Sequence, residues 1–139
     1  MALVLGKEEL TALLAEIFPQ VAADFRIEEL SEDHIQMRLL VQDRHLRPGG
    51  TVSGPSLFAL ADVSLYAMLM ARVGPKALAV TTSASIDFMR KPAAGQDVLA
   101  DCKLLKLGRV LVVGDVLMRS EGSDKVVARA SMTYSIPPE

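Results

Sequence analysis

The sequence predicts a single α+β domain spanning residues 1–139, with one long buried helix, a short N-terminal helix and about six antiparallel strands. Two patterns carry this prediction: a nearly uncharged helical segment in the first half of the chain, and alternating apolar residues in the second half. Of the 139 residues, 50% are hydrophobic and 23% are charged, so we expect the chain to fold around one core.

The first part of the chain predicts a helix followed by two strands. Leu10, Leu13, Leu14 and Ile17 recur at helical spacing in residues 7–18, and Pro19 ends this helix. Alternating apolar residues then flank the polar turn "SED": Phe25, Ile27, Leu30, Ile35, Met37 and Leu39. The next stretch, "QDRHLRPGG", is predicted to be a loop because proline and paired glycines disfavour regular structure.

The long helix has clear start and stop signals. Ser53 is a suitable N-cap, and Pro55 fits the first turn, where a missing N–H costs little. Nothing interrupts the helix before Val73, and Gly74 with the following proline ends it. Because the helix is apolar on nearly every side, we expect it to be buried.

The rest of the chain predicts four further strands. Their sequences are "KALAVTTSASIDFMR", "DVLADCKLLKL", "RVLVVGDVLMR" and "KVVARASMTYSI", and the turn "EGSD" joins the last two as a hairpin. Two of the strands show one-sided apolar faces, formed by Val98, Ala100, Cys102 and Leu104, and by Val126, Ala128, Ala130, Met132, Tyr134 and Ile136. Short turns between such strands are typical of an antiparallel sheet.

Composition excludes several classes of function. The formal net charge is -2 without a basic cluster, so we expect no nucleic-acid partner. Cys102 is the single cysteine and His34 and His45 are the two histidines, so we expect no disulfide, metal site or cofactor. The N-terminus does not resemble a signal peptide, and the most apolar window, residues 55–71, contains Asp62. We therefore expect a cytoplasmic protein that does not span a membrane.

Asp62 is the single charge between Arg47 and Arg72. A carboxylate on an apolar helix costs several kcal/mol unless it is paired, hydrogen-bonded or neutralised. Among its neighbours one turn away, Tyr66 alone could supply a polar group. Either Asp62 faces water or caps another element, or it is a catalytic acid, base or nucleophile in an apolar setting.

The segment "GGTVSG" before the helix favours the catalytic interpretation. Free N–H groups at a helix N-terminus stabilise developing negative charge, and Gly54 lets a carbonyl approach its N–H closely. Gly54 and Asp62 are about 12 Å apart along the helix axis at the usual rise, too far to share one carbonyl. In a two-fold dimer, Gly54 of one subunit could face Asp62 of the other.

At this point the sequence resembles the hotdog-fold thioesterases, in particular the small PaaI-type acyl-CoA thioesterases. "HLRPGGTVSGPSLFALAD" is similar to the family pattern H-x-N-x-x-G-x-x-H-G-G followed by a helix with L-x-D, and "AVTTSASIDFMRKPAAG" is similar to the family strand that ends before a proline and a glycine. The resemblance covers the chain from about Leu30 to Tyr134. It implies a sheet wrapped around the long helix and a dimer, or a tetramer of two dimers, with active sites at the dimer interface.

The resemblance also implies roles for individual residues. Asp62 falls on the catalytic carboxylate, Gly54 on the glycine whose N–H polarises the thioester carbonyl, and Thr81 on a hydroxyl that helps to place water. His45 and Gly50 match the first histidine and the first glycine of the pattern. His45 is also expected to order its loop.

Three residues depart from the family pattern. Arg47 replaces the asparagine, Ser53 replaces the second histidine and Pro55 replaces the last glycine. Gly54 keeps its N–H, and Ser53 can still cap the helix. Arg47 either binds a carboxylate or phosphate of the substrate or is a solvated loop residue.

The resulting hypothesis is hydrolysis of an acyl-CoA thioester, with Asp62 as nucleophile or general base and the Gly54 N–H as oxyanion donor. One alternative is a non-catalytic protein that binds acyl-CoA or another small ligand. A hotdog dehydratase is disfavoured because no histidine follows His45. Basic residues at strand ends either hold CoA phosphates or are solvated: Arg90, Lys91, Lys106 and Arg109.

Overall fold

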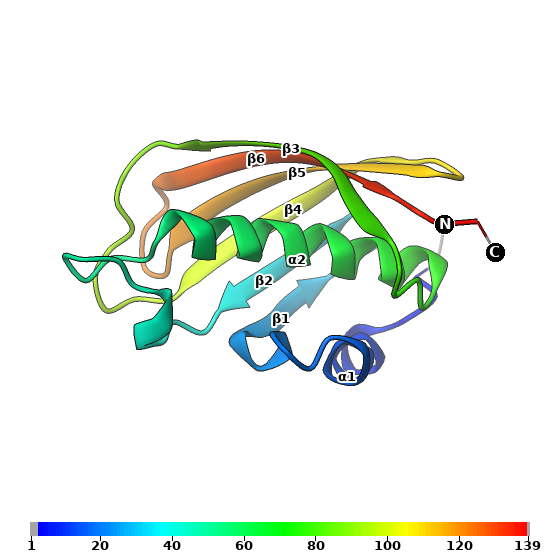
Figure 1. Ribbon diagram of the computed structural model, residues 1–139, viewed down its shortest axis with the longest axis horizontal. Coiled ribbons are helices and arrows are strands. Elements are labelled where there is room, and N and C mark those ends of the chain that lie inside the picture. The colour runs from blue at the N-terminus through cyan, green and yellow to red at the C-terminus, as the bar shows by residue number, and fades with distance from the viewer. Residues whose placement is uncertain (1–2, 139) are drawn as a thin grey trace.

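The computed structural model describes residues 3–138 as one antiparallel sheet that curves around a long helix (Figure 1). The six strands follow the order β1-β2-β4-β5-β6-β3. The helices are α1 (Lys7–Ile17) and α2 (Gly54–Val73), with 3-10 turns η1 (Ala22–Asp24) and η2 (Asp43–His45). The strands are β1 (Phe25–Leu30), β2 (His34–Leu39), β3 (Val80–Phe88), β4 (Val98–Leu107), β5 (Leu111–Ser120) and β6 (Val126–Ser135). This architecture confirms the predicted fold class.

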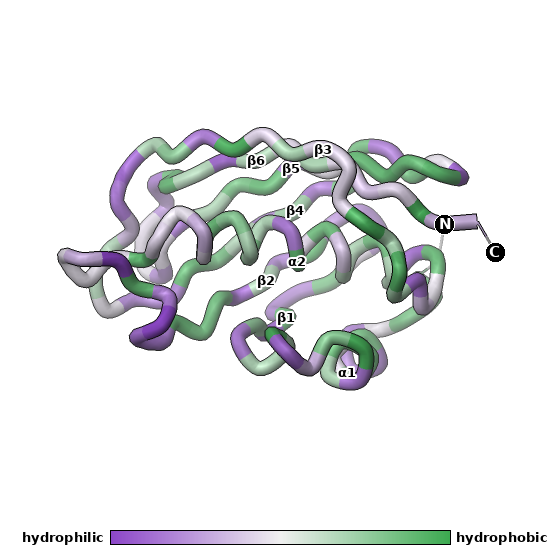
Figure 2. The backbone as a smooth tube through the Cα atoms, in the orientation of Figure 1, coloured by the Kyte–Doolittle hydropathy of each residue, from purple (hydrophilic) through white to green (hydrophobic). Residues whose placement is uncertain are grey.

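The limits of α2 match the signals in the sequence. The Ser53 hydroxyl accepts a hydrogen bond from the Ser56 N–H at 3.3 Å, so Ser53 is the N-cap. Gly74 ends the helix at φ 91°, a conformation that residues with a side chain rarely adopt. By length and hydropathy α2 could cross a bilayer, but 67% of its apolar window is buried inside the protein. The apolar composition of α2 therefore reflects its burial against the sheet. Hydrophobic residues run along most of the helix and the strands behind it (Figure 2).

The alternating strands place their apolar residues beneath α2. The predicted inward faces of β4 and of β6 from Ala128 onward are buried, and β1 and β2 contribute Ile27, Ile35, Met37 and Leu39. Val126 is half-buried and Val127 takes its place in the core, because the register shifts near this end of the β5–β6 pair. The core is thus formed by α2 and one face of the sheet, with Leu10 and Leu14 of α1 added at one side.

β3 is an edge strand with unusual exposure. It pairs with β6 on one side, and none of its residues is fully buried. Val80 and Phe88, at the two ends of the strand, are 57% and 54% exposed. An apolar edge of this kind offers unpaired backbone groups to another strand.

The helix lies so close to the sheet that one strand position excludes a side chain. A Cβ atom on Gly114 of β5 would lie 2.7 Å from Leu65 Cδ1 and 3.2 Å from the Lys103 carbonyl oxygen. Such contacts force a shift of the helix or the strand, which typically costs about 1–3 kcal/mol. Gly114 therefore sets the distance between α2 and β5.

We expect Gly114→Ala to lower the free energy of unfolding by about 1–3 kcal/mol, measured by urea denaturation. Leu65→Ala should also destabilise, because it leaves a cavity. In the double variant the new methyl group occupies part of that cavity, so its loss should be smaller than the sum of the two single losses. Strictly additive losses would show that the two residues do not limit the helix–sheet distance.

Candidate active site

Asp62 lies midway along α2, half-buried, with two hydroxyl groups bonded to its carboxylate. The Thr81 hydroxyl donates to Asp62 Oδ1 at 2.5 Å, and the Tyr134 hydroxyl donates to the same oxygen at 2.9 Å. The Tyr134 hydroxyl also lies 3.2 Å from the backbone carbonyl oxygen of Asp62. Within residues 3–138 both side-chain donors bond Oδ1, which leaves Oδ2 for a water molecule or a substrate atom.

The sheet brings these two donors together. Thr81 of β3 and Tyr134 of β6 are direct partners across the strand pair, so their side chains leave the same face, toward α2. The register of the β3–β6 pair shifts between Thr81 and Ser83, so the inward and outward positions of β3 alternate in the opposite phase after the shift. Local strand geometry therefore aims two hydroxyls at one helical carboxylate.

Tyr134 is held in its protonated form. Burial raises the pKa of the Tyr134 phenol well above its usual range, and the negative charge of Asp62 raises it further. A neutral phenol is a permanent hydrogen-bond donor at physiological pH. Tyr134 thus fixes the direction of the carboxylate without competing for its proton.

Tyr66, the polar neighbour expected from helical spacing, has another partner. Its hydroxyl donates to the Ala77 carbonyl oxygen at 2.7 Å, and burial raises the pKa of this phenol too. Its ring stacks on the ring of Tyr134 at a centroid distance of 5.8 Å. Tyr66 therefore does not bond Asp62, because the loop after α2 offers its hydroxyl a carbonyl. It is a buried core residue that supports Tyr134 through ring packing.

A hollow of about 470 Å³ opens beside the carboxylate. Asp62, Thr81 and Tyr134 form its polar wall. The remaining lining residues come from the end of α1, from α2 and from the segment before β3: Ile17, Phe18, Gln20, Tyr66, Ala77, Ala79 and Val80. The Asp62 hollow, as we call it, is thus a recess with a polar wall around Asp62 and apolar side chains on its other sides.

A second hollow, of about 420 Å³, surrounds the start of α2. Gly54 lies in it beside the Phe88 ring, and a Cβ atom at this position would lie 3.4 Å from Phe88 Cζ. Three predicted substrate-binding residues line the same hollow, namely Arg47, Arg90 and Lys91. This Gly54 hollow combines the first N–H of a helix, that of Gly54, with three cationic side chains.

Three predicted site residues have different surroundings. Ser53 lies next to Gly54, but its hydroxyl accepts the Ser56 N–H and caps α2. His45 is buried, with Nδ1 accepting the Gln42 N–H at 2.9 Å and Nε2 3.3 Å from Asp24 Oδ2, so it orders its loop and lines neither hollow. Arg109 lines a third hollow together with Val73 and residues 135–138.

Neither the cysteine nor a metal-binding cluster suggests another centre. Cys102 is fully buried, and burial, followed by the charge of Asp115, raises the pKa of its thiol to about 12, so it stays protonated. Within residues 3–138 no three His, Cys, Asp or Glu side chains are arranged to hold a metal ion. Asp62 combines an open recess beside its carboxylate with two oriented hydroxyl donors behind it.

Sequence reasoning missed Tyr134 as a site residue. Its alternation in the last strand correctly predicted an inward side chain, but the group that it would meet there depends on strand order. Tyr134 and Asp62 are 72 positions apart in the chain. No local pattern links them.

Comparison with known proteins places this geometry in a family. The family model of the thioesterase superfamily matches residues 49–134. A Pseudomonas aeruginosa protein that bears the name of an esterase is 29% identical over 108 residues, or 77% of this chain and 78% of that protein. A similarly named protein of Archaeoglobus fulgidus is 30% identical over 111 residues, which cover 79% and 69% of the two chains.

Solved structures agree with this placement. A Silicibacter structure titled as a thioesterase has a TM-score of 0.93 and 62% identity, with 99% of this chain and 96% of that chain covered. The phenylacetic acid degradation protein PaaI of Thermus thermophilus, solved as an N33D mutant, has a TM-score of 0.72 and 29% identity, with 86% and 99% covered. These matches confirm the resemblance to hotdog-fold thioesterases.

The contact between Tyr134 and Asp62 predicts an alkaline loss of stability. Unfolded tyrosines ionise near pH 10, at about their ordinary pKa, whereas folded Tyr134 keeps its proton to higher pH. Because the folded state then binds more protons, its stability is fully present below about pH 10 and falls as the pH rises further, by up to about 1.4 kcal/mol per pH unit.

Urea denaturation from pH 8 to 11 should show this loss in the wild type and less of it in Tyr134→Phe. The matched control is Tyr66→Phe. Burial raises the pKa of the Tyr66 phenol in the wild type, but its hydroxyl donates to a backbone carbonyl oxygen and not to a carboxylate. This control variant should retain most of the wild-type pH dependence. Parallel profiles for the wild type and Tyr134→Phe would contradict the assignment.

Proposed function

Because the chain belongs to the thioesterase superfamily, we propose that it hydrolyses acyl-CoA thioesters at a site shared by two subunits. The observation that carries this proposal is the Asp62 carboxylate, held by Thr81 and Tyr134 at the polar wall of an open recess. A single carboxylate with fixed orientation and one available oxygen is suited to act on a carbonyl group or on a water beside it.

Asp62 would act as general base or as nucleophile. As a base, its Oδ2 accepts a proton from water as that water attacks the thioester carbonyl, and the thiolate of CoA leaves. As a nucleophile, Oδ2 attacks the carbonyl directly, CoA thiolate leaves, and water then hydrolyses the mixed anhydride. In both routes the hydroxyls of Thr81 and Tyr134 hold the carboxylate in place, and Thr81 is near enough to help position the water.

The oxyanion donor would come from a second subunit. Within one chain, β3 begins at the Asp62 hollow, where Thr81 bonds Asp62, and ends at the Gly54 hollow, where Phe88 contacts Gly54. If the free edges of two β3 strands pair antiparallel, the Thr81 end of one lies opposite the Phe88 end of the other. Asp62 then faces Gly54 of the partner subunit, which supports the dimeric site.

The side chains on this edge favour burial between subunits. Phe58 of α2, Val80 and Phe88 of β3 and Met89 just after it are large apolar residues that are 37–57% exposed. Exposed apolar residues beside an unpaired strand are typical of an interface. Association of two such dimers into a tetramer stays a prediction.

The Gly54 hollow suits the CoA part of the substrate. The Gly54 N–H at the start of α2 would stabilise the negative charge that develops on the carbonyl oxygen. Arg47, Arg90 and Lys91 line the same hollow and could bind the phosphates of CoA. Arg47, which replaces the family asparagine, would thereby contribute charge rather than an amide.

We expect the wild type to release CoA from at least one member of a panel of short, medium, long and aromatic acyl-CoAs. Asp62→Asn keeps the shape of the side chain and removes its basicity, so kcat should fall by about 10²–10⁴. Thiol release is measured with a colorimetric thiol reagent, and calorimetric binding of the same acyl-CoA is the control. Binding without turnover in the wild type would instead support a non-catalytic acyl-CoA binding protein.

The Gly54 N–H can be tested by a matched pair of variants. Gly54→Pro removes the N–H at a first-turn position where Ser53, with φ -76° and ψ 158°, already has the conformation that a following proline requires. We expect a loss of about 10²–10³ in kcat. Gly54→Ala retains the N–H, and its Cβ meets the Phe88 ring at an ordinary contact distance, so most activity should remain.

Mixing the two inactive variants tests whether the site is shared. A heterodimer of Asp62→Asn and Gly54→Pro contains one intact site if Asp62 and Gly54 act across the interface. After unfolding and refolding an equimolar mixture, about a quarter of the wild-type activity should return by random pairing. No recovery, with dimers demonstrated by light scattering, would contradict a site that Asp62 and Gly54 share across the interface.

A further inference from the structure

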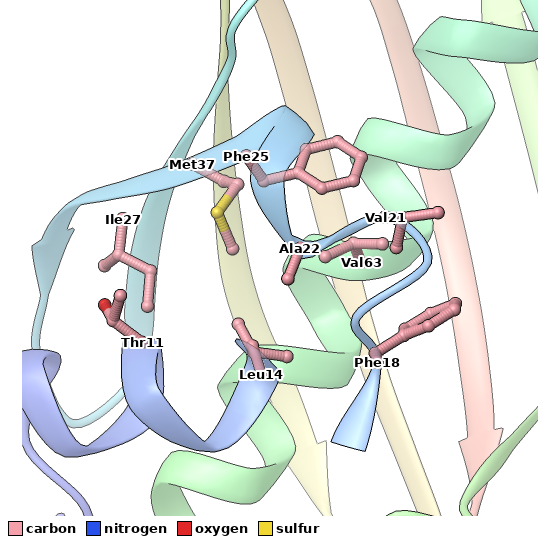
Figure 3. A pocket seen from close by; sticks show the side chains of 9 residues that line it. All are labelled: Thr11, Leu14, Phe18, Val21, Ala22, Phe25, Ile27, Met37 and Val63. Carbon is pink, nitrogen blue, oxygen red and sulfur yellow. The ribbon is translucent and has the colours of Figure 1, made fainter. Parts of the chain in front are cut away.

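A small apolar pocket lies behind the Asp62 hollow, between α1, the first two strands and α2 (Figure 3). Its volume is only about 20 Å³, and apart from Thr11 its lining is apolar. Leu14 and Met37 in its wall are buried, whereas Phe25 and Phe18 are half-buried. A pocket without polar partners holds water poorly and favours an apolar occupant.

Phe18 is the one residue that lines both this pocket and the Asp62 hollow. In Figure 3 its side chain lies on the opposite side of the pocket from Thr11. The two recesses also approach each other on α2, where Asp62 lines one and the next residue, Val63, lines the other. The Phe18 ring is therefore part of the wall between the recess beside the carboxylate and the apolar space behind it.

Ring packing fixes Phe18 in this wall. Its ring meets the ring of Tyr66 edge-on at a centroid distance of 6.0 Å, and Tyr66 stacks on Tyr134, which bonds Asp62. Phe18 is also the C-cap of α1, and its N–H donates to the Leu14 carbonyl oxygen at 2.9 Å. The backbone and the ring of Phe18 are thus both held in place, so the ring limits the recess at a fixed position.

We infer that Phe18 determines which acyl-chain lengths the protein accepts, with the tail of the substrate directed toward the pocket behind α1. This inference rests on the proposed function, since it concerns the acyl group whose carbonyl is held at Asp62. With the Phe18 ring in place, the Asp62 hollow ends at the ring and accepts short acyl groups. Without the ring, the hollow joins the pocket behind it and accepts longer chains.

The expected size of the effect follows from apolar burial. Each additional methylene that leaves water contributes about fourfold in affinity. Four further methylenes in the joined recess would give about 200-fold in the ideal case. We expect at least about tenfold, because the enlarged recess will not fit the chain perfectly.

The decisive variant is Phe18→Ala, and Phe25→Ala is its matched control. Both lose a half-buried phenyl ring from the same pocket, but Phe25 does not line the Asp62 hollow. Affinities for S-butyl-CoA and S-dodecyl-CoA, thioethers that cannot be hydrolysed, are measured by calorimetry, with thermal unfolding as a check on folding. Phe18→Ala should shift affinity toward S-dodecyl-CoA by at least about tenfold, and Phe25→Ala should leave the ratio near that of the wild type.

A filling substitution provides the reverse test. Val63→Phe in the Phe18→Ala background occupies the pocket from α2 and should restore the wild-type ratio. An unchanged ratio in folded Phe18→Ala, or an equal shift in Phe25→Ala, would overturn the inference. Should Phe18→Ala not fold, Phe18→Leu replaces it, with the same expected direction and a smaller shift.

Kinetics separate this inference from the proposed function. If the wild type hydrolyses acyl-CoAs, the ratio of kcat/KM for dodecanoyl-CoA to that for butyryl-CoA should rise with the affinity ratio in Phe18→Ala. Turnover with an unchanged ratio overturns the role of Phe18 alone. Absence of turnover for every acyl-CoA overturns the proposed function, and the thioether affinities then decide whether Phe18 limits chain length in a binding protein.

Discussion

The apolar surface of α2 is greater than one face of a helix can present to a flat sheet, and the rest of the structure follows from this excess. The sheet curves around the helix so that twelve of its residues are buried, and Gly114 allows the close approach that this burial requires. The side that the sheet leaves open is bordered by β3 and contains Asp62 and Phe58. The open side of the core is therefore also where the ionisable group lies.

The hydroxyl groups around Asp62 allow a charged carboxylate to lie beside the apolar core. Hydroxyl donors orient the carboxylate. A cation in their place would lower the basicity of the carboxylate. The protonated state of Tyr134 is maintained by the burial that the core imposes and by the charge that it contacts. Core packing and site chemistry thus depend on the same side chains, and the Phe18–Tyr66–Tyr134 rings connect the N-terminal helix to the carboxylate.

Local sequence features predicted the helices and strands well, but they could not predict long-range contacts. Ser53, Pro55 and Gly74 marked both ends of α2, and the lone charge in an apolar helix identified Asp62. The donors to Asp62 come from residues 19 and 72 positions away, on strands whose order the alternating pattern does not determine. Tyr66, one turn from Asp62, was a reasonable partner by spacing, but its hydroxyl donates to the carbonyl oxygen of Ala77. The grouping of Gly54 with Arg47, Arg90 and Lys91 likewise depends on how two loops meet.

The length of β3 has a consequence for assembly. In the proposed dimer, the strand spans from the carboxylate of one site to the oxyanion amide of the other, so the alignment of the two subunits is itself part of the catalytic geometry. The smallest slip that keeps the same side chains facing inward is two residues, about 6.6 Å along the strand. Such a slip would separate Asp62 from Gly54 of the partner subunit by more than a hydrogen bond can span. A misaligned pair would be well packed and inert, so that turnover itself would report correct assembly.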